Sequence, residues 1–398
     1  LFEVARRSAA ELPPPPEGPK GFVGLLEVIG RAVAQIGEEI IELTSFFGQT
    51  LSVLWRVLTH PRRIRWVSIV HAMEYAGLNA VPIVSLLSFF IGLVVAGLGT
   101  RFYVLLPNAR PAPDMKAPTT PEAVAKGKYL VEHVTGCTGC HSPIDESKPG
   151  DVPVEGKRGA GRDFGPMGKA PFRLRAANLT PDPDTGIGKA SDGEIVRAMR
   201  EGIGRDGRAL FPQMPYQTYA KTLSDDDALA IVAYLRTLAP VKNDPGKTEI
   251  QFPVSMFIRA LPQPLTGSPP PAPPPSDKLA RGNWLLDVAS CHDCHDSTNE
   301  RMEKIPGKAF GGGTRYPVGS KTIVAPNISS DKATGIGAYS DDDLRRVFDE
   351  GKGKSGRTLY MMPWSYYSGM TKEDKEAMIV ALRAQPPVNN LVVAKGLE

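Results

Sequence analysis

The sequence predicts a mainly α-helical chain, in which an N-terminal amphipathic and membrane-spanning segment precedes two copies of one repeated domain in tandem. Three observations carry this prediction. Residues 81–99 form a run without a single charged side chain. Residues 178–188 reappear, together with the pattern that follows them, at residues 327–337. Each copy contains one Cys-x-x-Cys-His pattern, and the two patterns use all four cysteines of the chain.

Composition bounds the class of protein. The 398 residues exceed the roughly 150 that are typical of one domain, so the length predicts two or three domains. Hydrophobic residues make up 41 % and charged residues 23 %, close to globular averages, which excludes disorder throughout and a collagen-like chain. The net charge of +4 includes no basic block that could follow a phosphate backbone, so nucleic acid is not an expected partner.

The chain is predicted to begin with a tail and an amphipathic helix. Residues 1–21 include four consecutive prolines and form the tail. From residue 22 to residue 58, apolar residues recur at helical spacing with Glu38, Glu39 and Glu42 between them, which is typical of a helix lying on a membrane. For this segment alone, a core helix of a soluble domain would give the same pattern.

The uncharged run that starts at Val81 is long enough to cross a hydrocarbon core about 30 Å thick. We therefore predict one transmembrane helix from Val81 to about Leu106, and we assign residues 22–107 to a membrane anchor. The run starts too far into the chain for an ordinary cleavable signal peptide, so the anchor is expected to remain. Arginines flank the run on both sides, so the positive-inside rule only weakly favours a cytoplasmic N-terminus.

Part of this anchor resembles the start of the permease subunit of bacterial ABC-type phospholipid transporters that are associated with MCE proteins. The resemblance covers residues 22–97 and is clearest in residues 54–63 (LWRVLTHPRR) and 81–96 (VPIVSLLSFFIGLVVA). Such permeases continue with several more membrane helices, whereas this sequence runs into the repeated domains. A complete permease is therefore not expected, and the segment is either a recruited anchor or part of a fusion.

The doubled cysteine pattern predicts covalent attachment of haem c. The first copy consists of Cys137, Cys140 and His141, and the second of Cys291, Cys294 and His295. Two thiols at this spacing can bond the two vinyl groups of one porphyrin, and the next residue supplies an imidazole as proximal iron ligand. A zinc site of four thiols would leave both histidines without a role, and a thioredoxin-like pair has no need of a second copy.

We therefore expect two covalently bound haem c groups. Haem c is attached on the outer side of the bacterial plasma membrane, so the chain is predicted to lie in the inner membrane with everything after residue 107 in the periplasm.

The repeat sets the predicted domain limits. Residues 108–262 form the first domain and residues 277–398 the second, and the Pro-rich residues 263–276 form a stiff, extended linker. Three helices are predicted in each domain, several of which begin with a Ser and an acidic residue three positions later. They cover residues 121–136, 191–202 and 224–238 in the first domain, and residues 276–290, 340–351 and 371–383 in the second.

Each haem iron needs a sixth ligand or keeps an open site. Met214 and Met362 occupy matching repeat positions, and each precedes a proline that fixes a turn, so we predict them as axial ligands. Met361 is the alternative in the second domain, and a methionine that only fills the core is the alternative in both. The histidines that we disfavour as axial ligands, because of their positions, are His60, His133 and His292.

Four further residues recur at equal repeat positions and could bond haem propionates or serve turns and the surface. They are Asn178 and Arg208 in the first domain and Asn327 and Arg357 in the second.

Both domains resemble class I cytochrome c. The segment from Asn178 to Leu238, with the motifs TPDxxTGIG, SDxE, DGRxLFPxMPY and AYLRTL, is similar to the cytochrome c subunits of membrane-bound alcohol, aldehyde and gluconate dehydrogenases. The resemblance covers nearly all of residues 117–388. It implies an N-terminal helix that crosses a C-terminal helix over the haem, with Gly127 and Tyr129 on the former in the first domain and Gly282 and Trp284 in the second. Those subunits commonly carry three haem domains and a C-terminal anchor, whereas this chain has two and an N-terminal anchor.

These features together predict an electron relay, because ligation by His and Met raises the reduction potential and leaves no open coordination position. The expected donor is a membrane or periplasmic dehydrogenase or a quinol-linked complex, and the expected acceptor is a downstream cytochrome or a terminal oxidase. The partners are thus redox proteins and membrane lipid. The alternatives are a dihaem peroxidase or oxygenase, an accessory component of a lipid transporter, and the dihaem subunit of a haem-copper oxidase.

Overall fold

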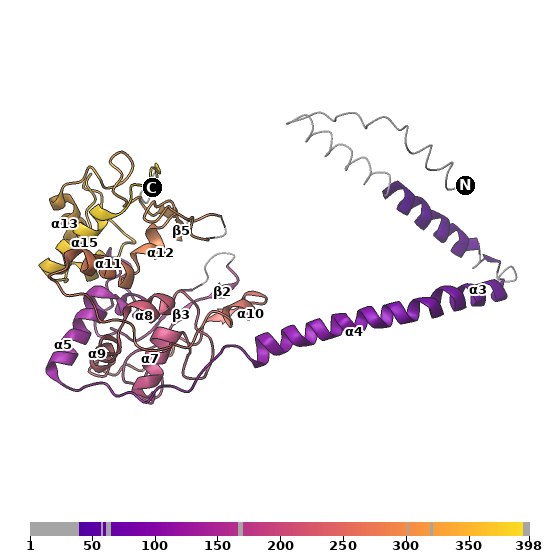
Figure 1. Cartoon of the computed structure of the whole chain (residues 1–398), viewed down its shortest axis with the longest axis horizontal. Coiled ribbons are helices and arrows are strands. Elements are labelled where there is room, and N and C mark those ends of the chain that lie inside the picture. The colour runs from indigo at the N-terminus through magenta and orange to yellow at the C-terminus, as the bar shows by residue number, and fades with distance from the viewer. Residues whose placement is uncertain are drawn as a thin grey trace, which may run out of the picture. The chain divides into compact units, whose positions relative to one another are not determined.

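The computed structural model describes residues 40–56, 59–60, 65–165, 170–300, 302–318 and 321–392 (Figure 1). The predicted tail and residues 22–39 of the predicted amphipathic helix lie outside the described residues. The chain divides into two compact units, residues 1–93 and 94–398. The described residues are mainly helical, as predicted, and their strands are short.

A long apolar helix follows residue 65. It consists of α3 (Trp66–Met73), the π-helical turn η3 (Glu74–Leu78), α4 (Asn79–Gly99) and the π-helical turn η4 (Thr100–Val104). By length and composition, it is the one helix among the described residues that could cross a membrane. The helix starts well before the predicted Val81. Pro82 has no N–H with which to bond the carbonyl of Leu78, and the wide turn η3 immediately precedes this break in the helical pattern. Residues 40–56 form a further, fully exposed helix.

The second unit contains the two copies of the repeat. The first copy contains α5 (Pro121–Tyr129), the π-helical turn η5 (Leu130–Val134), α6 (Cys137–Cys140), α7 (Asp192–Glu201), α8 (Tyr216–Thr222), α9 (Asp225–Leu235) and α10 (Val254–Ile258). The second contains α11 (Lys278–Val288), α12 (Cys291–His295), α13 (Asp341–Glu350), α14 (Trp364–Tyr367) and α15 (Lys372–Ala384). The three predicted helices of each copy are confirmed, while the short helices α6, α8, α10, α12 and α14 were not predicted.

The predicted helix caps are confirmed. The Ser191 hydroxyl accepts a hydrogen bond from the Glu194 backbone N–H, and the Glu194 carboxylate accepts one from the Ser191 N–H. Ser340 and Asp343 form the same reciprocal pair at the start of α13. Helix α7 ends at Gly202, whose φ of +71° is a left-handed conformation that glycine adopts without strain.

Among the described residues of the second unit, three small antiparallel sheets connect the loops. They pair β1 (Arg162–Asp163) with β3 (Arg175–Ala176), β2 (Phe172–Arg173) with β4 (Glu249–Ile250), and β5 (Arg315–Val318) with β6 (Lys321–Val324). In register, Arg162 faces Ala176, Phe172 faces Ile250 and Arg315 faces Val324. Strands of two to four residues are too short for an alternating pattern to predict them.

In each copy the first helix crosses a later one at a glycine, α5 with α9 and α11 with α15. A Cβ atom added to Gly127 of α5 would lie 1.8 Å from the carbonyl oxygen of Ala230 in α9. In the second copy, a Cβ on Gly282 of α11 would lie 2.0 Å from the carbonyl oxygen of Ala377 in α15. Since no side chain fits into so small a gap, the crossing implied by the cytochrome c resemblance is confirmed in both copies.

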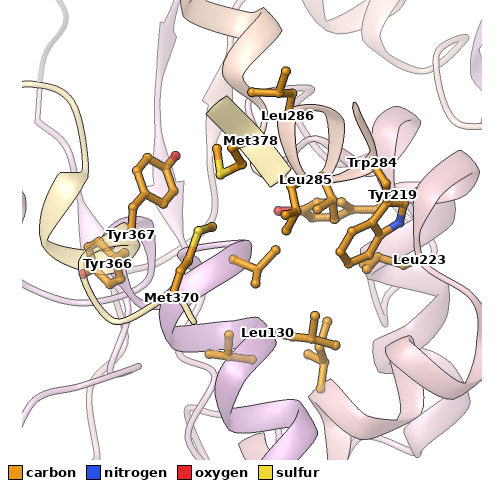
Figure 2. Packing of buried hydrophobic residues seen from close by; sticks show 14 of the residues in the cluster. Leu130, Tyr219, Leu223, Trp284, Leu285, Leu286, Tyr366, Tyr367, Met370 and Met378 are labelled. Atoms are coloured by element: carbon orange, nitrogen blue, oxygen red, sulfur yellow. The ribbon is translucent and has the colours of Figure 1, made fainter. Parts of the chain in front are cut away.

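The two copies share one hydrophobic core. Figure 2 shows Tyr219 and Leu223 of the first copy beside Trp284 and Leu285 of the second, all of them buried. The Trp284 indole N–H donates to the Thr222 carbonyl oxygen over 2.8 Å. The copies are therefore packed together and are not separate bodies joined by a spacer.

A buried carboxylate also links the copies. Asp374 of α15 is 4 % exposed and accepts hydrogen bonds from Arg281 of α11 at 2.8 and 2.9 Å. It also accepts one from the Tyr129 hydroxyl of the first copy at 2.6 Å. Burial alone would raise the pKa of Asp374, but Arg281 and Tyr129 together lower it below its ordinary value. Burial and the Asp374 carboxylate raise the pKa of Tyr129 to about 12.

Gly127→Ala and Gly282→Ala should each lower the free energy of unfolding by about 1–3 kcal/mol or more, because the added methyl group overlaps a helix backbone. Gly353→Ala is the matched control, since its Cβ would lie 3.7 Å from the nearest atom. Thermal unfolding followed by circular dichroism measures the effect. Unchanged midpoints in the first two variants would contradict the crossing.

Asp374→Asn should lower the free energy of unfolding by about 3–5 kcal/mol at pH 7, because it leaves Arg281 without its buried partner. The folded-state pKa of Asp374 lies below the unfolded value of about 3.9. The carboxylate therefore stabilises the fold above that value, and this contribution is lost as the pH falls through the folded-state pKa. In denaturant titrations, the difference in free energy of unfolding between wild type and Asp374→Asn should be smaller in acid, below the folded-state pKa, than at pH 7. Glu373→Gln, at an exposed position, should leave the free energy of unfolding unchanged under both conditions.

Candidate haem-binding site

Each cysteine motif begins a short helix after a sharp reversal of the chain. Gly136 and Ser290 directly precede α6 and α12, and both adopt left-handed conformations with φ of +59° and +57°. Within each helix, the two cysteines are three residues apart and so lie on one face. This arrangement presents two thiols to one side, as attachment to a single porphyrin requires.

The two motif histidines are held in the same way. The Nδ1–H of His141 donates to the Ala177 carbonyl oxygen over 2.7 Å, and that of His295 to the Pro326 carbonyl oxygen over 3.0 Å. With Nδ1 engaged, Nε2 is the nitrogen left to bind a metal ion. Desolvation by the surrounding walls lowers the pKa of both imidazoles, outweighing the opposing effect of the carbonyl bond. Both rings are therefore neutral at pH 7, which is the form that binds iron.

The predicted axial methionines occupy matching turns. The Tyr216 N–H donates to the Met214 carbonyl oxygen and the Trp364 N–H to that of Met362, both over 2.8 Å. Each bond spans a proline and closes an inverse γ-turn, after which α8 or α14 begins. Met214 and Met362 are half-buried and pack against the core, whereas Met361 is 38 % exposed.

All of these side chains line one cavity of about 1260 Å³. It brings together the eight predicted site residues Cys137, Cys140, His141, Met214, Cys291, Cys294, His295 and Met362, and also Met361. The cavity exceeds the roughly 300–1,000 Å³ typical of a site for one small molecule. Its walls are largely apolar, with Leu174, Ile187 and Ile195 among them. The size, the walls and the neutral imidazoles fit two haem c groups.

The other histidines do not line this cavity. His133 donates from Nδ1 to the Tyr366 carbonyl oxygen over 3.0 Å. His292 lies between Asp296 and Asp287, with nitrogen–oxygen distances of 2.8 and 3.3 Å. Burial lowers the pKa of His292, but the two carboxylates outweigh it and raise the pKa to about 9. A protonated imidazole held by two carboxylates is a poor iron ligand.

The repeated asparagines hold loops together, which is one of the two roles expected for them. The Asn178 amide donates to the Val241 carbonyl oxygen over 2.7 Å, and its oxygen accepts from the Thr180 N–H over 2.9 Å. Asn327 makes the equivalent bonds with Val388 and Ser329. The repeated arginines, Arg208 and Arg357, both line the cavity.

Three features of the site could not be assigned from sequence. The carbonyls that orient the histidines belong to Ala177 and Pro326, and their position directly before the repeated asparagines was the available signal. The Tyr366 ring of the second copy packs on Gly139 of the first motif, where a Cβ would lie 3.2 Å from it. Tyr219 and Tyr367 occupy equal repeat positions close to the cysteines, and burial raises the pKa of both well above its ordinary value.

The cytochrome c family model matches residues 124–239. The cytochrome c subunit of alcohol dehydrogenase (quinone) from Gluconacetobacter polyoxogenes is 28 % identical over 288 residues, which cover 68 % of this chain and 58 % of that protein. The gluconate 2-dehydrogenase cytochrome c subunit of Pantoea cypripedii is 31 % identical over 242 residues, covering 58 % and 51 %. A diheme cytochrome c-type protein of Cereibacter sphaeroides is 25 % identical over 284 residues, covering 69 % and 90 %.

The chain spans between half and three-fifths of the length of the two dehydrogenase subunits. The cytochrome c match over residues 124–239 includes the first cysteine motif. The resemblance of residues 22–97 to a lipid-transport permease stays a prediction. The resemblance to dehydrogenase cytochrome c subunits is confirmed. With a cytochrome c match over residues 124–239, this chain is homologous to the cytochrome c subunits of alcohol and gluconate dehydrogenases and to a dihaem cytochrome c.

Proposed function

We propose that this chain is a dihaem c-type cytochrome that relays electrons for a dehydrogenase. The observation that carries the proposal is the single cavity lined by both cysteine motifs and both Met-Pro turns. In this proposal, Cys137, Cys140, His141 and Met214 hold the first haem, and Cys291, Cys294, His295 and Met362 hold the second. The domain limits are those given by the repeat, residues 108–262 and 277–398.

The chain's own residues fix the position and environment of the iron. When bound, haem c supplies a centre that gains and loses one electron. The cysteines would anchor the ring, while the carbonyls of Ala177 and Pro326 orient the imidazoles that would bind the iron. The methionines of the two Met-Pro turns would supply the second axial donor, which would leave no coordination position for a substrate. Outer-sphere electron transfer is therefore favoured over catalysis on an open iron.

The packing of the copies supports transfer between the two haems. Both motifs face one cavity, and Tyr366 of the second copy lies against Gly139 in the first motif. The Trp284–Thr222 and Tyr129–Asp374 hydrogen bonds fix the two copies against each other. A fixed and short separation favours an internal relay, in which one haem receives the electron and the other passes it on.

The names of the relatives suggest the partners. The donor in this proposal is a dehydrogenase subunit that oxidises an alcohol or a sugar acid, or a quinol-linked complex. The acceptor is a downstream cytochrome, a terminal oxidase or, as the name of the alcohol dehydrogenase relative suggests, a quinone. The long apolar helix would anchor the chain in the bacterial inner membrane with the haem domains in the periplasm.

Each motif should hold one haem. The purified full-length protein should contain two haems per chain by pyridine haemochrome assay, and Cys137→Ala/Cys140→Ala or Cys291→Ala/Cys294→Ala should halve that number. The reduced wild type should bind little carbon monoxide, because both irons have six ligands. Strong carbon monoxide binding at one haem would overturn the relay and favour a peroxidase-type enzyme.

The axial ligands can be tested one at a time. Met214→Ala and Met362→Ala should each remove the far-red sulfur-to-iron absorption band of one oxidised haem and lower the potential of that haem, because a sulfur ligand is lost. Met361→Ala is the matched control and should leave the spectrum unchanged. A band lost in Met361→Ala but kept in Met362→Ala would assign the ligand to Met361 instead.

A further inference from the structure

Two exposed phenylalanines lie at the short helix α10, Phe252 just before it and Phe257 within it. Phe252 is 72 % exposed and Phe257 is 57 % exposed. Among the described residues from 107 to 392, they are the two exposed phenylalanines, since the others in that range are buried or half-buried. Exposing two large aromatic rings to water on one short segment is unfavourable, so contact with an apolar partner would stabilise this segment.

Helix α10 is fastened to the end of the long apolar helix. The rings of Phe257 and Phe102 meet edge to face, with centroids 6.3 Å apart. The Arg259 guanidinium donates to the carbonyl oxygens of Phe102 at 2.6 Å and Tyr103 at 3.2 Å, and also to that of Leu106. These bonds satisfy carbonyls that the end of a helix leaves unpaired. Both α10 and the last residues of the long helix belong to the second unit. These contacts therefore place α10 beside the end of the helix.

The two chain segments that contain α10 and the end of the long helix, residues 250–276 and 75–113, are largely apolar and contain no carboxylate. Exposed apolar side chains continue along the helix end through Tyr103, Val104 and Leu105. Arg259 is the one charged residue between Glu249 and Asp277. Between Glu74 and Asp114, the charged residues are Arg101 and Arg110, and both side chains are exposed.

This combination matches the boundary of a lipid bilayer. Aromatic residues are enriched where a spanning helix leaves the hydrocarbon, and arginine is favoured beside lipid phosphates. A carboxylate at this level would be repelled by anionic headgroups, and the segment has none. A protein partner would also cover apolar rings, but it would not explain why the rings lie beside the end of a membrane-length helix.

We propose that residues 252–257 form a second membrane contact, in which Phe252 and Phe257 enter the boundary between headgroups and acyl chains. This inference rests on the proposed membrane anchor, because it takes the end of η4 as the point where the helix leaves the bilayer. A single helix would let the haem domains rotate about its axis. The second contact removes that rotation and holds the first copy at the membrane surface.

Spin labelling of the full chain tests this contact. Phe257→Cys adds a thiol to a protein whose four cysteines are occupied by haem in this proposal, so one nitroxide can be attached. The labelled protein is placed in nanodiscs of phosphatidylcholine and phosphatidylglycerol, and power saturation is measured with oxygen and with a water-soluble nickel chelate. The label should be several-fold less accessible to the chelate than one at Leu279→Cys, an exposed apolar position on α11.

The possible outcomes separate this inference from the anchor. A label at Leu87→Cys in α4 reports the anchor and should be accessible to oxygen and not to the chelate. If Leu87 lies in lipid while the Phe257 label is open to the chelate, or is shielded from both reagents, the second contact is wrong and the anchor stands. If both labels are open to the chelate, the anchor is also wrong. Phe252→Cys repeats the measurement at a neighbouring exposed site, and an unchanged haem spectrum verifies folding.

Discussion

One asparagine in each copy holds the haem-binding loops in place. These loops contain little regular structure, so their backbone groups need partners other than a helix or a sheet. The Asn178 side chain supplies such partners, because its amide donates to the Val241 carbonyl oxygen after α9 and its oxygen accepts from the Thr180 N–H. The carbonyl of Ala177, which orients His141, directly precedes this junction. The orientation of His141, the proposed iron ligand, therefore depends on the side chain of Asn178, which is not itself one of the proposed ligands.

A second constraint is the shared core. A domain of about 120 residues with so few helices buries a modest hydrophobic core, and packing two such domains together enlarges it. The buried pair Trp284 and Leu285 of the second copy completes the core around Tyr219 of the first. The same packing brings both cysteine motifs to one cavity, so the arrangement that stabilises the fold also shortens the path between the proposed haems.

Local signals in the sequence predicted local structure well. Capping boxes such as that of Ser191 depend on residues three positions apart, so a short pattern reveals them. The close contact of Gly127 with Ala230 joins distant parts of the chain and was expected only from the resemblance to cytochrome c. Helix α8 was missed because its start is encoded in a proline turn and not in a periodic run. The Pro-rich linker suggested separate domains, whereas the two copies share one core. No local pattern could show that Tyr366 packs on Gly139, because that contact joins residues more than 200 positions apart.

The contacts between the copies are reciprocal. Trp284 on the first helix of the second copy donates a hydrogen bond to Thr222, just before α9 of the first copy. Tyr129, at the matching position of the first copy, accepts a hydrogen bond from Thr371 just before the last helix of the second. Such an exchange of equal surfaces is the geometry of a twofold homodimer. Because both halves lie on one chain, their association is intramolecular and independent of protein concentration. Unlike the two subunits of a homodimer, the halves have different sequences, so each proposed haem is free to acquire its own reduction potential and its own partner.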